Sequence, residues 1–196
     1  ALASHDREHP QADYVCIQDQ AHLERWLARL AEAELIAIDL ETDSLEYMNA
    51  AIVGVSFALQ PGEAAYLPLG HCGPDQPEQL ERDASLARLK PLLEDPALAK
   101  VGQNLKYDMS VLANHGIHLR GVAHDTMLES YCLDATASRH DMGSLAERHL
   151  GYRPIAYEAV AGKGARQIGF DQVALAEAVD YAAEDADIPL RLHQTL

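Results

Sequence analysis

The sequence predicts an α/β fold that contains an antiparallel meander of three strands. Short apolar segments rich in Val, Ile and Phe are joined by tight connections, which is typical of antiparallel strands. Further along the chain, apolar segments are followed directly by helical patterns, which is typical of α/β proteins. Apolar residues form 48% and charged residues 23% of the 196 positions, as in ordinary globular proteins of one domain.

The N-terminal half supplies the meander. Its first strand begins apolar and ends in acidic residues, and Pro61-Gly62 forms a tight turn between the second strand and the third. The short connections make the three strands antiparallel. The elements expected in this half are a strand at 14–18, an amphipathic helix at 20–33, strands at 36–43, 51–59 and 64–69, and a helix at 85–93.

The C-terminal half contains more helix. Asp125 and Asp141 are expected as N-caps, and Gly151 as the residue that closes a helix. Pro189 removes a backbone hydrogen bond, so we expect a kink or an end there. The elements expected in this half are a strand at 100–102, a helix from 104, a strand at 119–123, a helix from 126, a helix at 142–150, an irregular segment at 152–170 and a long helix at 171–192.

Two carboxylates share one face of the strand at 36–43. Because alternate residues of a strand point to the same side, Asp39 and Glu41 lie opposite Ile38 and Leu40. Their attachment points are roughly 7 Å apart, and like charges at the end of a buried strand repel unless a positive charge lies between them. A divalent metal such as Mg²⁺ or Mn²⁺ is the simplest candidate. The alternative is a strand that runs out into a solvated acidic turn.

Two further acidic residues stand where a site could form. Asp108 lies in the first turns of a helix that directly follows a strand, a usual place for sites in α/β proteins, although it could simply interact with the helix dipole. Tyr181 and Asp185 are four residues apart on the last helix and therefore share a face. The neighbours on that face are small or apolar, so the face points inward and the buried carboxylate needs a partner.

The composition limits the classes of function. A formal net charge of −16 argues against a broad duplex-DNA footprint, because phosphate contacts need many Lys and Arg, but it is compatible with a small site that contacts nucleic acid through metal ions. Acidity could also serve solubility alone. No apolar run is long enough to span a membrane, residues 1–13 lack a signal-peptide core, and the cysteines form no CxxC motif, which together favour a reducing cytoplasm.

The acidic positions and the stretches around them resemble a known enzyme family, the DEDD superfamily of 3′–5′ exonucleases in its Tyr-containing branch. The motifs, in the family's order, are Asp39-Leu-Glu41, Asn104-Leu-Lys-Tyr-Asp108 and Tyr181-Ala-Ala-Glu-Asp185. Longer stretches at 53–58, 102–108, 125–131 and 141–148 are similar to the proofreading domains of the bacterial DNA polymerase I family. The resemblance covers roughly residues 33–196.

The resemblance implies a ribonuclease H-like fold, which is a mixed sheet of three antiparallel strands plus parallel strands, flanked by helices. We expect an N-terminal linker at 1–12 and an exonuclease domain at 13–196, with a polymerase domain following in a full-length chain. Leu40 stands where the family is expected to carry a small polar residue such as Thr. It points away from Asp39 and Glu41 and should be tolerated.

The implied chemistry is hydrolysis of the last phosphodiester at a 3′ end, with release of a nucleoside 5′-monophosphate. By resemblance, Asp39, Glu41 and Asp185 would hold one Mg²⁺ or Mn²⁺, with Zn²⁺ as a substitute in vitro. Asp39 would bridge to a second metal ion, which Asp108 would reach largely through water. Tyr181 would orient the attacking water, because a phenol with a pKa near ~10 is a poor base.

The same resemblance implies how a single-stranded or frayed DNA 3′ end would be held. Leu45 would wedge between the terminal bases and Tyr157 would stack on one, with about 1–3 kcal/mol per stacked base. Both could instead be ordinary packing residues. Other substrate contacts are expected from Thr42, Gln103, Asn104, Tyr107 and Arg139. The expected partners are the DNA 3′ end and the polymerase domain of the same full-length chain, for a monomer in the bacterial cytoplasm that binds no membrane.

Three other functions stay open. An inactive domain would only support a polymerase structurally, although inactive relatives would be expected to lose a carboxylate. An RNA-trimming exonuclease of the same superfamily would carry the same acids. A non-enzymatic binding module could use His115 and His118, or His71 and Cys72, for zinc, but neither pair has the spacing of a structural site.

Overall fold

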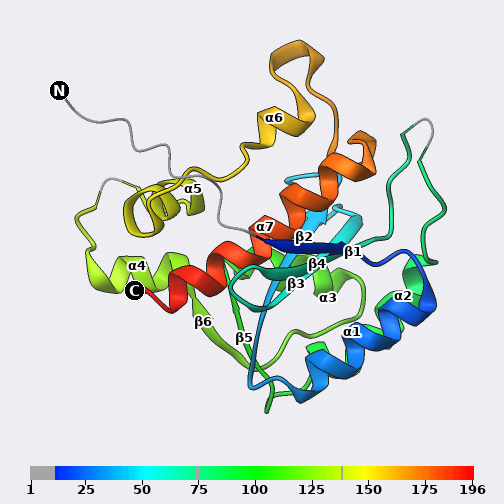
Figure 1. Cartoon of the computed structure of the whole chain (residues 1–196), viewed down its shortest axis with the longest axis horizontal. Coiled ribbons are helices and arrows are strands. Elements are labelled where there is room, and N and C mark those ends of the chain that lie inside the picture. Colours follow the sequence, from blue (N-terminus) through cyan, green and yellow to red (C-terminus); the bar gives the residue numbers. More distant parts are fainter. Residues whose placement is uncertain (1–11, 74–75, 138) are drawn as a thin grey trace.

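The computed structural model describes residues 12–73, 76–137 and 139–196. The expected linker at 1–12 therefore falls, except for residue 12, outside the described residues. Within the described ranges the strands form one sheet with the order β1-β4-β3-β2-β5-β6 (Figure 1). The strands are β1 (Asp13–Cys16), β2 (Leu35–Thr42), β3 (Ile52–Gln60), β4 (Glu63–Pro68), β5 (Ala99–Gly102) and β6 (Val122–Asp125).

The pairing of these strands confirms the expected mixed sheet. β2 pairs with β3, and β3 with β4, in antiparallel fashion, so the predicted meander is present. β5 and β6 extend the sheet in parallel beyond β2, and β1 pairs in parallel with β4 at the other edge. The strand expected at 119–123 begins later, at Val122, because Gly121 adopts a left-handed φ of +68° that interrupts extended backbone.

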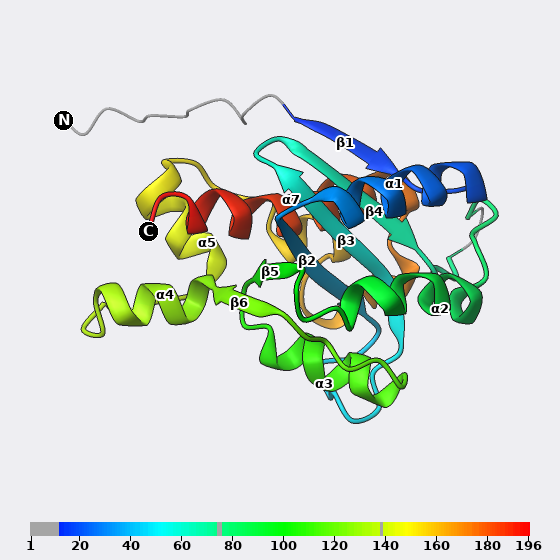
Figure 2. The same ribbon diagram turned by 90° about the horizontal axis from the view of Figure 1, so that it is seen from below.

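Helices cover both faces of the sheet (Figure 2). They are α1 (Gln20–Glu32), α2 (Arg82–Leu93), α3 (Lys106–Asn114), α4 (Thr126–Leu133), α5 (Met142–Leu145), α6 (Tyr157–Ala161) and α7 (Leu175–His193), with a π-helical turn at Ala146–Leu150 and 3₁₀ turns at Gly164–Arg166 and Phe170–Gln172. On one face, α1, α2 and α3 form a core with Ile36, Ile38 and Leu40 of β2. On the other face, α7 packs across β2, β3 and β4. None of the described helices is long and apolar enough to cross a membrane.

The last helix differs from the prediction at both ends. It begins at Leu175 instead of 171, because Phe170–Gln172 form a separate 3₁₀ turn. At its other end it reaches His193, one residue beyond the expected 192. The expectation at Pro189 was a kink or an end; the helix does not end there, and the kink stays a prediction. Pro189 and both of its neighbours are buried, and this packing compensates for the hydrogen bond that the proline cannot make.

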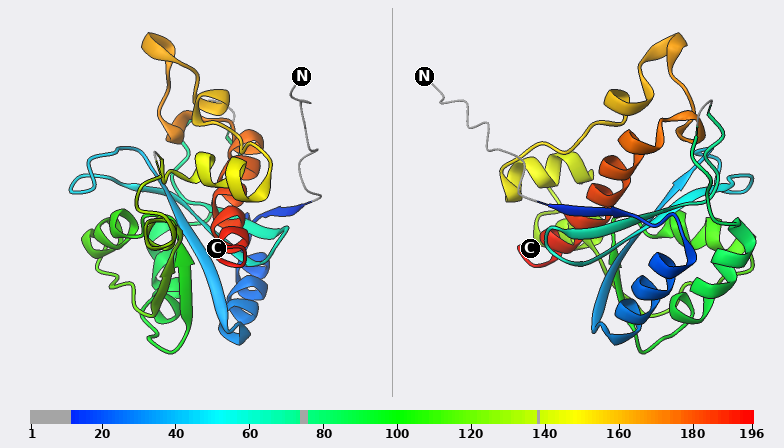
Figure 3. Two further views of the ribbon diagram at one scale, coloured as in Figure 1. Left: turned by 90° about the vertical axis from the view of Figure 1, so that its left-hand side faces the viewer. Right: turned by 45° about the vertical axis from the view of Figure 1, so that its right-hand side comes forward.

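The segment expected to be irregular at 152–170 contains the short helix α6. Its Tyr157 and Ala161 stand one turn apart and pack against Phe170 and the start of α7. Contacts distant in sequence therefore stabilise a helix that is too short to be recognised locally. The tip of the segment between α6 and α7 stands away from the sheet (Figure 3), whereas Phe170 at its end packs against Tyr66 of β4.

Gly54 in β3 leaves room for the ring of Tyr66 in β4. A Cβ at Gly54 would overlap that ring, which is fully buried and whose hydroxyl forms a 2.8 Å hydrogen bond with His71 Nε2. We expect Gly54→Ala to lower the free energy of unfolding by about 1–3 kcal/mol, measured by urea denaturation. Gly143→Ala is the matched control, because a Cβ there meets its nearest neighbour at an ordinary 3.6 Å. Equal stability of the two variants would contradict the packing argument.

Candidate active site

The end of β2 meets the middle of α7 through small side chains. Ala183 and Ala186 of α7 are fully buried beside Ala37 of β2, and their size allows the helix to approach the strand closely. The alternation of the strand then directs the next two residues on that face, Asp39 and Glu41, toward α7. Two carboxylates of the strand therefore enter the space between sheet and helix.

Asp185 of α7 joins these two carboxylates. One oxygen each from Asp39, Glu41 and Asp185 lies within 4.8 Å of the other two. Glu41 and Asp185 are buried. The structure thus brings together three of the four acids that the sequence singled out, from two elements at opposite ends of the chain.

Asp108 lies beside this group. It stands in the first turn of α3, is buried, and accepts a 3.1 Å hydrogen bond from the backbone N–H of Leu40. After burial itself, the charge of Asp108 is the largest cause of the raised pKa of Asp39. Asp108 belongs to the same charge cluster without joining the three oxygens that approach one another most closely.

Tyr181 lies one helical turn before Asp185 and donates a hydrogen bond to its carboxylate. The Tyr181 ring packs against Phe170 and Tyr157, with centroid distances of 5.5 and 6.1 Å. Burial, followed by the charges of Asp185 and Glu41, raises the pKa of the phenol. Tyr181 is therefore a protonated hydrogen-bond donor at neutral pH.

Burial raises the pKa of each carboxyl group in the cluster, and the neighbouring carboxylates add to this effect at Asp39 and Glu41. Burial raises the pKa of Asp108 to about 7 and that of Asp185 to about 8. Burial first, and the neighbouring carboxylates second, raise the pKa values of Asp39 and Glu41 well above their usual range. Ionising all of them together is costly unless a cation joins them.

The donor set of this cluster fits a divalent cation. Among the described residues that line the adjoining cleft, none is Lys or Arg, so no side-chain cation there balances the carboxylates. Glu41 Oε1 is buried and has no hydrogen-bond partner within the described part of the chain. Carboxylate oxygens are hard ligands that suit Mg²⁺ and Mn²⁺. A metal ion would supply both the missing charge and the missing partner.

A cleft of about 550 Å³ opens beside the carboxylates. Four residues predicted to contact substrate line it together with Asp39, Glu41, Tyr181 and Asp185, and they are Thr42, Leu45, Tyr107 and Tyr157. The hydroxyls of Thr42 and Tyr107 are 2.6 Å apart, which fixes both side chains. Leu45 is 94% exposed, which is unusual for a large apolar side chain and does not fit the alternative that it is a packing residue.

Comparison with known proteins decides the family. Residues 14–196 match the family described as 3′–5′ exonuclease. The chain belongs to the 3′–5′ exonuclease family. This exonuclease is 60% identical over 188 residues to DNA polymerase I of Pseudomonas aeruginosa, covering 95% of the chain and 21% of that protein. It therefore spans about a fifth of the length of that relative.

Solved structures confirm the expected ribonuclease H-like fold of the exonuclease. The EXO domain of Aedes aegypti Nibbler is 15% identical and superposes with a TM-score of 0.69, covering 96% of this chain and 90% of that domain. NrnC of Brucella melitensis, in a structure with bound Mg²⁺, is 18% identical with a TM-score of 0.61, covering 93% of this chain and 79% of NrnC. At these identities the likeness concerns the fold.

Three predicted substrate contacts of the exonuclease lie elsewhere. Gln103, Asn104 and Arg139 are absent from the described residues that line the cleft. The Gln103 amide donates a 2.9 Å hydrogen bond to the carbonyl of His140, and the Arg139 guanidinium lies 3.2 Å from the carboxylate of Asp141. Asn104 has a left-handed φ of +58°, which its side chain type tolerates. Their roles toward substrate stay predictions.

The cleft of the exonuclease also includes residues that sequence reasoning did not select. Asp43 and Ser44 directly follow the acidic strand, and Asp43 accepts a 2.8 Å hydrogen bond from the backbone N–H of Ala51. Their position in the sequence next to Leu45, a predicted substrate contact, could have indicated that they also line the cleft. Gln167 lies between the 3₁₀ turn at Gly164–Arg166 and α7, and no local pattern indicates that the chain returns to the site there.

Proposed function

We propose that this exonuclease removes nucleotides from the 3′ ends of single-stranded or frayed DNA and serves as the proofreading domain of a DNA polymerase I. The observation that carries the proposal is the group of Asp39, Glu41 and Asp185, whose oxygens lie within 4.8 Å of one another beside an open cleft. Such a group is unfavourable by itself and is stabilised by a bound cation. The product would be a nucleoside 5′-monophosphate.

The carboxylates are the proposed metal ligands. Asp39, Glu41 and Asp185 would hold one divalent ion, and Asp39 with Asp108 a second, with Mg²⁺ or Mn²⁺ in use and Zn²⁺ as a substitute in vitro. When bound, such ions lower the pKa of water and stabilise negative charge on the leaving oxygen. The contribution of the chain is a buried pocket of converging carboxylates, whose mutual repulsion in the metal-free state favours cation binding.

Tyr181 would hold the attacking water in place. Its raised pKa leaves the phenol protonated, so it is a poor base, while its oxygen and proton can form hydrogen bonds with water and with Asp185. The packing of its ring against Phe170 and Tyr157 fixes the position of the hydroxyl. An orienting role follows from these contacts.

Leu45 and Tyr157 would hold the terminal bases. Both line the cleft beside the carboxylates, and a base of any sequence can stack on an aromatic ring. A strand must leave its partner to enter such a site. Mismatched ends fray more easily than paired ones, and this difference would be the physical basis of editing.

We expect Leu45→Ala to reduce kcat/KM on single-stranded DNA by about fivefold to thirtyfold, the range of about 1–2 kcal/mol for one lost base contact. The melting temperature should be unchanged, since the side chain is 94% exposed. Leu128→Ala is the control, because Leu128 of α4 is also exposed and does not line the cleft. Equal kinetics of the two variants would remove Leu45 from the substrate site.

The proposal also includes the domain organisation of the longer chain. We assign 13–196 to the exonuclease domain and 1–12 to a linker, in a longer monomeric chain of the bacterial cytoplasm that also contains a polymerase domain. The length of the Pseudomonas relative supports this, since the chain covers 21% of it. A net charge of −16 attracts duplex DNA poorly, so the polymerase domain would supply most of the DNA affinity.

The test is degradation of 5′-labelled oligonucleotides by the purified protein. Single-stranded DNA should shorten stepwise from the 3′ end with Mg²⁺ or Mn²⁺ and stay intact with EDTA. Persistence of the DNA with both metals would contradict the proposal. Faster degradation of an RNA of matched sequence would instead favour an RNA-trimming exonuclease.

A further inference from the structure

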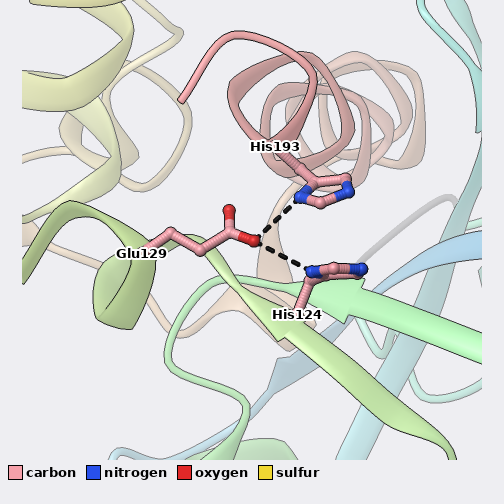
Figure 4. A group of neighbouring side chains, drawn as sticks. All are labelled: His124, Glu129 and His193. Atoms are coloured by element: carbon pink, nitrogen blue, oxygen red, sulfur yellow. Dashed lines mark hydrogen bonds and ion pairs between the residues drawn. The ribbon is translucent and has the colours of Figure 1, made fainter. Parts of the chain in front are cut away.

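A second group of metal-ligating side chains lies toward the C-terminal end of α7. His124 comes from β6, Glu129 from α4 and His193 from the last turn of α7, and the three point toward one another (Figure 4). His193 stands eight residues beyond Asp185. At about 1.5 Å per residue this is about 12 Å along the helix axis, so the group is separate from the carboxylate cluster.

The ligand atoms of this group converge. Nδ1 of His124 and Nδ1 of His193 lie 3.0 and 2.8 Å from the same oxygen, Oε1 of Glu129. The two imidazole rings have centroids 3.7 Å apart and planes 34° apart. A tetrahedral ion with bonds of about 2.0–2.1 Å separates its ligand atoms by about 3.3 Å. Each imidazole nitrogen would have to move by about half an ångström or less from Oε1 to reach this separation. The three ligand atoms lie within 4.8 Å of one another.

Hydrogen bonds alone leave this group incompletely satisfied. Both imidazoles form hydrogen bonds with Oε1 of Glu129. The other oxygen, Oε2, is buried and has no hydrogen-bond partner in the described ranges of the chain. The three side chains are between 23% and 37% exposed, so an ion and a water ligand can reach them from solvent. The net charge of −16 further favours a cation.

We propose that His124, Glu129 and His193 bind Zn²⁺, and that the bound ion links the last turn of α7 to β6 and α4. Two imidazoles and one carboxylate form a ligand set that suits Zn²⁺, whereas Mg²⁺ prefers oxygen ligands throughout. The ion would join three elements that are distant in sequence. The proposal does not depend on the proposed nuclease function, because it uses none of the residues of the cleft.

The test is Zn²⁺ binding by the whole chain in excess Mg²⁺, which competes with Zn²⁺ for the oxygen ligands of the carboxylate cluster. Co²⁺ serves as a spectroscopic substitute. The unaltered protein should show the intense visible absorption of four-coordinate Co²⁺, and one equivalent of Zn²⁺ should remove it. His193→Gln should lower Zn²⁺ affinity at least about tenfold, although its amide can still donate a hydrogen bond to Glu129.

His118→Gln is the matched control, since His118 is exposed and lies outside the group. Zn²⁺ should raise the melting temperature of the unaltered protein and of His118→Gln, but not that of His193→Gln or Glu129→Gln. Circular dichroism checks that each variant is folded. Zn²⁺ affinity in His193→Gln and Glu129→Gln equal to that of the unaltered protein would overturn the proposal. So would the absence of Zn²⁺ binding in excess Mg²⁺, whatever the nuclease activity.

Discussion

Replacement of Asp185 by Ala is expected to lower the rate of 3′ cleavage by at least about a thousandfold, equivalent to about 4 kcal/mol of transition-state stabilisation. Asp185 supplies one of the three oxygens that approach within 4.8 Å, and it accepts the hydrogen bond of Tyr181. Its loss would remove a proposed metal ligand and release the phenol at once. Single-turnover degradation of a 5′-labelled oligonucleotide in saturating Mg²⁺ measures the effect.

Variants of neighbouring residues show whether the loss of activity comes from the position of Asp185 or from a general change in charge. Asp180→Ala removes an exposed carboxylate from the same helix and should leave the rate within about twofold. Asp108→Ala should also cut the rate by orders of magnitude, and Tyr181→Phe should cost less because the carboxylates remain. Undiminished cleavage by Asp185→Ala would exclude the proposed mechanism.

In metal-free protein, Asp185→Asn is expected to increase the free energy of unfolding by about 1–3 kcal/mol at pH 8 and by much less at pH 5. Burial raises the pKa of Asp185 to about 8, against about 3.9 in an unfolded chain. A group with a raised folded pKa contributes stability below its unfolded pKa, and that contribution is lost as the pH rises through the folded pKa. The asparagine has no proton to lose, so the advantage of the variant should grow with pH.

Urea denaturation of both proteins in EDTA, at pH 5 and pH 8, measures this difference. Addition of Mn²⁺ at pH 8 should reverse the order, because the unaltered protein gains a bound ion that the variant binds weakly. The comparison of two proteins at each pH cancels the titration of exposed acids that both share. If Asp185→Asn increases the free energy of unfolding equally at pH 5 and pH 8, the destabilisation does not come from the charge of Asp185.

Much of the fold is predictable because it depends on residues close together in sequence. The alternation of Ile38 and Leu40 against Ala37 predicts two different faces of β2, and the structure confirms it by placing these residues in separate core clusters. The predicted N-caps Asp125 and Asp141 are also confirmed, since each side chain accepts backbone N–H groups at its helix start.

The candidate site is less accessible to such reasoning, because it depends on contacts between distant segments. Spacing indicates that Asp39 and Glu41 share a face, but nothing local indicates that this face meets Asp185. Only the resemblance to the 3′–5′ exonuclease family predicted that Asp39, Glu41 and Asp185 form one site. The course of α7 past Pro189 is a similar case, since buried packing outweighs the local preference for a break.

The most direct test of the account is where Mn²⁺ binds. Crystals of the protein grown with Mn²⁺ should give an anomalous peak within about 2.5 Å of carboxylate oxygens from Asp39, Glu41 and Asp185, and Asp185→Ala should lose it. A structure in which Mn²⁺ is bound elsewhere, while these three carboxylates contact no ion, would contradict the claim that they form the metal centre of an exonuclease.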